Sequence, residues 1–100
     1  MGTKITLVID NPADTPAFDA AYPRVLELAS QLTGLQRVES AKVWPKEDGT
    51  PTPAYRTLDL YFESYEAASA AVADEPGGAF FQEVIGLGTT FTGLFSDIEQ

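Results

Sequence analysis

Apolar and polar residues alternate along residues 4–10 (KITLVID) and 55–63 (YRTLDLYFE). This pattern predicts two β-strands, because successive side chains of a strand point to opposite faces. One face of the pair is apolar and is expected to lie under helices: Ile5, Leu7, Leu58, Leu60 and Phe62. The opposite face mixes polar and aromatic residues: Thr6, Val8, Thr57, Asp59 and Tyr61, with Tyr55 and part of Trp44 expected on the same side.

A helix is predicted between these strands, because apolar residues recur there at steps of three and four: Phe18, Tyr22, Val25, Ala29 and Leu32. Thr15 is expected to cap this helix and Gly34 to end it. Pro23 has no amide hydrogen to donate to the preceding turn, so a kink or a short break is expected there. The rigid part would then run from Pro23 to Thr33.

The remaining segments complete the order strand, helix, strand, strand, helix, strand. They are a strand at 36–44, a turn-rich connection at 45–53, a helix at 65–73 capped by Ser64 and ended by the Pro-Gly-Gly run at 76–78, a short helical turn at 79–85 and a strand at 89–95. This order predicts a ferredoxin-like α+β fold, a βαββαβ antiparallel four-stranded sheet with the helices on one face. Residues 1–100 are expected to form a single domain, since the chain is long enough for one core only.

The amino-acid composition and the net charge reduce the number of possible functions. The net charge of −9 opposes binding to nucleic acid and to anionic membranes, and it suits a protein of the cytoplasm. The chain has neither cysteine nor histidine, which excludes disulfides, thiolate nucleophiles and histidine-based catalysis. The acidic pairs at 47–48 and 74–75 are interpreted as solvated turn charges, so no metal and no cofactor are expected. No stretch is long and apolar enough to predict a membrane span.

The uncovered sheet face supplies the candidate functional residues. A half-polar, aromatic-rich face is typical of a cavity or a wet subunit interface, and two such faces opposed would close a barrel between subunits. Asp59 is either an exposed strand carboxylate or, if desolvated in such a barrel, a general acid or base. Tyr55 and Tyr61 either orient a ligand or pack against the sheet of a partner.

Several segments together resemble the EthD-like family of the dimeric α+β barrel superfamily. They are KITLVID at 4–10, FDAAY at 18–22, Gly34-Leu35 and AYRTLDLYFESYEA at 54–67, of which residues 61–67 are the most specific. The resemblance implies a homodimer with a central barrel and a pocket beside the first helix. Relatives are associated with degradation of ethers and similar compounds, and other members of the superfamily are cofactor-free monooxygenases, isomerases or dehydratases.

The chain departs from the family pattern in the first helix. Family members often carry a His and then a Pro-Leu pair after the Phe-Asp-x-x-Tyr segment, whereas this chain has Leu26 and Leu28 where the His and the Pro would be. Asp59 is then the one candidate catalytic residue. The candidate ligand-binding residues are Tyr22, Trp44, Tyr55 and Tyr61.

Three functions are compatible with these features. The leading hypothesis is a small homodimer that binds a hydrophobic or aromatic small molecule in a barrel pocket, with a role in degradation or secondary metabolism. The alternatives are a cofactor-free monooxygenase, isomerase or dehydratase that uses Asp59, and a non-catalytic interaction module whose sheet face binds another protein.

Overall fold

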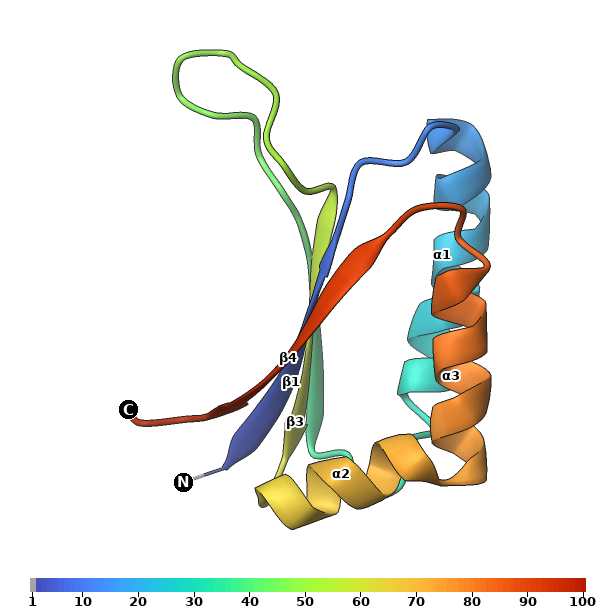
Figure 1. The fold of residues 1–100 in the computed structure, drawn as a ribbon, viewed down its shortest axis with the longest axis vertical. Coiled ribbons are helices and arrows are strands. Elements are labelled where there is room, and N and C mark those ends of the chain that lie inside the picture. The colour runs from blue at the N-terminus through green and yellow to red at the C-terminus, as the bar shows by residue number, and fades with distance from the viewer. Residues whose placement is uncertain (1) are drawn as a thin grey trace.

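The computed structural model describes residues 2–100 and contains one four-stranded antiparallel sheet in the order β2-β3-β1-β4. The strands are β1 (Thr3–Ile9), β2 (Arg37–Lys42), β3 (Arg56–Phe62) and β4 (Phe91–Asp97), and the helices are α1 (Thr15–Ala29), α2 (Tyr65–Ala73) and α3 (Glu75–Ile85). All three helices lie on one side of the sheet, with α1 and α3 side by side and α2 across one end (Figure 1). The predicted ferredoxin-like fold is confirmed.

The two faces of the sheet differ as the alternation predicted. Leu7 pairs with Leu58 and Ile5 with Leu60 across β1 and β3, and all four side chains are buried under the helices. On the other face, Thr6 pairs with Asp59, and the β1 and β3 residues of this face are half-buried. We call this surface, away from the helices, the open face. Its partial burial comes from the flanking strands alone, since no helix covers it.

Helix α1 differs from the prediction at both ends and in its middle. Asp14, not Thr15, is the N-cap, because its carboxylate accepts a hydrogen bond from the amide of Ala17 at 3.1 Å. The helix ends at Ala29, before Gly34, which has a positive φ of 80° in the following turn. The helix is also unbroken at Pro23, whose exposed position leaves the unpaired carbonyl of the preceding turn open to water.

The second half of the chain contains two helices, where one helix and a short helical turn were predicted. Helix α2 has the predicted bounds and its predicted cap, since the Ser64 hydroxyl accepts a hydrogen bond from the Ala67 amide. Helix α3 starts at Glu75 rather than 79, because Asp74 caps it and Pro76 occupies the first turn, where a missing amide hydrogen costs nothing. Strand β2 is shorter than expected, and β4 begins and ends two residues later.

The connection between β2 and β3 projects beyond the end of the sheet and away from the helices (Figure 1). It turns at Gly49, which has a positive φ of 82°, and is held by hydrogen bonds from the Thr50 amide and hydroxyl to Asp48. Among residues 2–100, no helix combines the length and apolar character needed to cross a bilayer.

Candidate functional site

Asp59 lies in the middle of the open face and is held by residues of β1. The Thr6 hydroxyl donates a hydrogen bond of 2.5 Å to Asp59 Oδ1, and the Lys4 ammonium lies 3.8 Å from the same oxygen. The Asp59 side chain is only 20% exposed. Its Oδ2 has no hydrogen-bond partner within residues 2–100, so it is the oxygen that remains available to another molecule.

Tyr61 lies beside Asp59 on the same face but is engaged with β2. Its hydroxyl donates to Glu39 Oε1 at 2.7 Å, and the Arg37 guanidinium lies 4.4 Å from its ring centre and 3.3 Å from Glu39. Hydrogen bonding with the Tyr61 side chain and, second, the negative charge of Glu39 raise the pKa of Arg37. The open face therefore combines charges of both signs with one aromatic ring.

Tyr55 does not lie on the open face, contrary to the prediction. Regular alternation begins only at Arg56, and the Tyr55 side chain turns toward α1. Its hydroxyl donates to Asp19 at 3.0 Å, and its ring meets Phe18 edge-on with centres 5.1 Å apart. Tyr55 and Asp59 are thus on opposite sides of the sheet and do not share one site.

Arg56 joins this second cluster beside α1. Its guanidinium lies 3.6 Å from Asp19 and 4.5 Å from the Tyr55 ring centre, and the side chain is only 16% exposed. Arg56 was not among the candidate site residues predicted from the sequence. The signal was present, however, because two-residue alternation back from Leu58 places Arg56 on the helix side of the sheet.

Tyr22 is buried in the core between α1 and the sheet. Its ring stacks on Phe18, and its hydroxyl lies 2.8 Å from that of Ser40 on β2. Burial raises the pKa of the Tyr22 hydroxyl, against the smaller opposing effects of the Ser40 hydrogen bond and of Arg56. Tyr22 lies next to the Arg56 cluster but is not among the residues that line the pocket described next.

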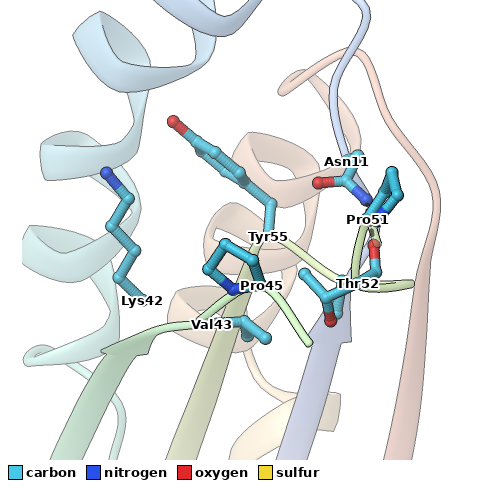
Figure 2. A pocket seen from close by; sticks show the side chains of 8 residues that line it. Asn11, Lys42, Val43, Pro45, Pro51, Thr52 and Tyr55 are labelled. Atoms are coloured by element: carbon cyan, nitrogen blue, oxygen red, sulfur yellow. Dashed lines mark hydrogen bonds between the residues drawn. The ribbon is translucent and has the colours of Figure 1, made fainter. Parts of the chain in front are cut away.

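A pocket of about 300 Å³ opens where the β2–β3 connection meets the ends of the central strands. We call it the Tyr55 pocket, and it is lined by Asn11, Lys42, Val43, Pro45, Pro51, Thr52, Ala54 and Tyr55. Figure 2 shows the side chains of Lys42 and Tyr55 extending in the same direction, with Pro45 between them in this view. The Asn11 amide donates to the Thr52 carbonyl at 2.7 Å, which fixes the connection against the end of β1.

A second hollow, of about 440 Å³, adjoins this pocket and shares three of its residues. We call it the Trp44 hollow, and it is lined by Lys42, Val43, Trp44 and Pro45. Trp44 lies beyond the end of β2 and is 86% exposed, so it is not part of a strand of the open face. Of the predicted ligand-binding residues, Tyr55 and Trp44 therefore lie near one another, while Tyr61 and Tyr22 lie elsewhere.

One curated relative identifies the family of the chain. It is an uncharacterized 11.0 kDa protein from the thcB-thcC intergenic region of Rhodococcus erythropolis, 34% identical over 98 residues, which span 96% of this chain and 94% of the relative. This chain belongs to the same family as the Rhodococcus protein. No family model matches the chain.

Solved structures of an EthD family protein and of other ferredoxin-like proteins share the fold of this chain, which is the fold that the sequence resemblance implied. An ethyl tert-butyl ether D (EthD) family protein from Bacillus halodurans superimposes with a TM-score of 0.90 at 19% identity, over 98% of this chain and 99% of the other. SnoaB, a cofactor-independent oxygenase from Streptomyces nogalater, gives a TM-score of 0.72 at 12% identity, over 99% and 94%. A dimeric ferredoxin-like protein of unknown function from Thermobifida fusca gives 0.73 at 10%, over 98% and 92%.

The first helix of this chain has Leu26, and no acid-base group, at the position where the EthD-like pattern often has histidine. Leu26 stands there, half-buried and packed against the core. The helix position that would carry an acid-base group in such relatives therefore carries a side chain that packs against the core in this chain.

Proposed function

We propose that this EthD-like protein is a single-domain homodimer that binds a small, largely apolar molecule in the Tyr55 pocket. The observation that carries the proposal is the make-up of this pocket. Its walls come mainly from Val43, Pro45, Pro51, Ala54 and the ring of Tyr55, with few polar groups among them. Apolar walls with a few convergent polar groups are typical of ligand sites, and about 300 Å³ is at the lower end of their size range.

The dimer part of the proposal rests on the open face. Val8 and Thr57 pair directly across β1 and β3 on this face without a helix above them, and Tyr61 lies on the same face. A second open face, applied by two-fold symmetry, would cover these residues and complete a barrel. A structural neighbour from Thermobifida fusca is described as dimeric, which supports self-association of this fold.

The binding part is tested with two small probes of nearly equal shape, benzamide and benzoate. Trp44 is the chain's single tryptophan and lines the adjoining hollow, so its fluorescence reports occupancy directly. We expect saturable binding of at least one probe, and its loss in Thr52→Phe, which fills the pocket. Thr33→Phe adds the same ring at an exposed position after α1 and should leave binding unchanged. Absence of saturable binding of both probes to the wild-type protein would overturn the proposal.

A second candidate function is acid-base catalysis by Asp59, and the free Oδ2 of this residue favours it. A carboxylate oxygen without a protein partner can take a proton from carbon next to a carbonyl group, and the Thr6 and Lys4 contacts at Oδ1 would hold it in place. Tyr55 does not take part in this candidate, because it lies on the other side of the sheet. Once a substrate that turns over is found, Asp59→Asn should keep the fold and the dimer and lose turnover, whereas unchanged turnover removes Asp59 from the mechanism.

A further inference from the structure

The basic residues of this acidic chain differ in whether a carboxylate lies close to them. Four of the six have a carboxylate at 2.7 to 3.8 Å: Lys4, Arg24, Arg37 and Arg56. The other two, Lys42 and Lys46, have no carboxylate partner within residues 2–100. They stand on either side of the Trp44-Pro45 pair, where the two hollows meet.

Lys42 is the cation that faces both hollows. Its ammonium lies 5.9 Å from the Tyr55 ring centre, at the outer limit of a cation-π contact, and donates no hydrogen bond to another side chain or carbonyl within residues 2–100. Lys42 lines the Tyr55 pocket and the Trp44 hollow alike. In Figure 2 its ammonium lies beside the Tyr55 ring rather than pointing away from it.

Trp44 supplies an aromatic surface next to this cation. At 86% exposure its ring is available for stacking on a planar ligand. Pro45 lines the same hollow and adds a second flat apolar surface. A planar ring and an anionic group would thus find matching surfaces within a single short segment.

The charge of the whole chain does not oppose such a ligand at this point. Screening limits the reach of exposed charges to about 8 Å at physiological ionic strength, so the nearest groups decide. Apart from Lys42, the lining residues carry no charge. The Asp19 carboxylate, which accepts from the Tyr55 hydroxyl at 3.0 Å, is offset by the Arg56 guanidinium at 3.6 Å. A neutral ligand would cover the hollow and leave the Lys42 ammonium without a partner, whereas a carboxylate would pair with it.

We propose that the ligand of the Tyr55 pocket is an aromatic carboxylate that extends into the adjoining Trp44 hollow, with the carboxylate held by Lys42 and the ring held against Trp44 and Pro45. This inference rests on the proposed ligand-binding function and names the chemical class of the ligand. Nothing in it depends on the dimer or on Asp59.

The test compares benzoate with benzamide, which differ chiefly in charge, by Trp44 fluorescence at low ionic strength. Because Lys42 is exposed, we expect benzoate to bind about fivefold more tightly than benzamide. Lys42→Gln should remove this preference by weakening benzoate alone. Arg24→Gln removes one positive charge from the outer surface of α1, where Arg24 pairs with Glu27, and should leave the preference intact.

The outcomes separate the two proposals. Equal binding of benzoate and benzamide, or an unchanged preference in Lys42→Gln, would overturn the carboxylate inference and leave the ligand-binding function standing. Saturable binding of neither probe would overturn both. Added salt should weaken benzoate binding more than benzamide binding, since the contact is an exposed ion pair.

Discussion

The hydroxyl oxygens of Tyr22 and Ser40 lie 2.8 Å apart, which ties α1 to the edge strand β2. Burial raises the pKa of the Tyr22 hydroxyl above its ordinary value. The unfolded chain therefore loses this proton first as the pH rises. Stability from this group is complete below about pH 10, the unfolded pKa, and is lost as the pH climbs from there toward the folded pKa.

We predict that Tyr22→Phe flattens this alkaline decline, measured as the free energy of unfolding in urea between about pH 8 and pH 11. At neutral pH the variant should lose about 1 kcal/mol, because the hydrogen bond to Ser40 is gone. Tyr65→Phe changes an exposed tyrosine and is the control, which should keep the decline. A decline equally steep in Tyr22→Phe would show that other groups cause it.

The neighbouring glycines of α3 should respond in opposite directions to alanine. A methyl group at Gly77 would lie 2.2 Å from the Ala71 carbonyl oxygen and 2.8 Å from the backbone of Val72, whereas Gly78 has nothing within 4 Å of such a group. Because the obstacle at Gly77 is backbone, we expect Gly77→Ala to cost about 2 to 3 kcal/mol. Gly78→Ala should stabilise by about 0.5 to 1 kcal/mol through helix propensity. Chemical denaturation measures both, and equal effects would contradict the close approach of α2 and α3.

A charge on the open face should separate the subunits of the proposed dimer. Val8→Glu places a carboxylate at the pair formed with Thr57, and two such faces opposed would bring like charges together. We expect the dissociation constant of the dimer to rise at least about tenfold by sedimentation, with unchanged circular dichroism. Ala20→Glu adds the same charge to an exposed position of α1 and should leave association unchanged. A wild-type protein that is monomeric at micromolar concentration would contradict the dimer itself.

The fold was predictable because its main determinants are local and periodic. Strict alternation around Leu7 and Leu58 identified the buried face, and Ser64 marked the start of α2. Helix α2 ends at Ala73 as predicted, but the Pro-Gly-Gly run at 76–78 that was expected to end it lies inside α3, because Asp74 both ends α2 and caps α3. When one helix follows another without a loop, the same few residues carry the stop signal of the first helix and the start signal of the second.

The candidate site was less predictable, because its residues come together from separate elements. Tyr55 was assigned to the wrong face, since strand geometry starts only at the next residue and the contact with Asp19 turns the side chain toward α1. Lys42 and Asn11 meet in one pocket although they lie in different parts of the chain. No periodic pattern in the sequence predicts that two such residues line one pocket, because this depends on how the β2–β3 connection folds over the end of the sheet.

The contribution of Arg56 to stability should come mainly from its aromatic contacts rather than from its ion pair. Asp19 is 47% exposed and lies 3.6 Å from the guanidinium, so the pair is worth at most about 1 kcal/mol. The Tyr55 and Tyr22 rings lie 4.5 and 5.5 Å from a guanidinium that is largely shielded from water. Such contacts are worth up to about 2 kcal/mol, and the packing of the Arg56 stem adds to them.

We therefore predict that Arg56→Ala costs about 2 kcal/mol or more in urea unfolding, whereas Asp19→Ala costs less than about 1 kcal/mol. The double variant should show a coupling energy below about 1 kcal/mol in a double-mutant cycle. Arg56→Lys keeps the positive charge but lacks the planar guanidinium, so it should still lose part of the stability. If the coupling energy between Asp19 and Arg56 equals the cost of Arg56→Ala, the ion pair dominates, and the aromatic contacts are incidental to the position of Arg56.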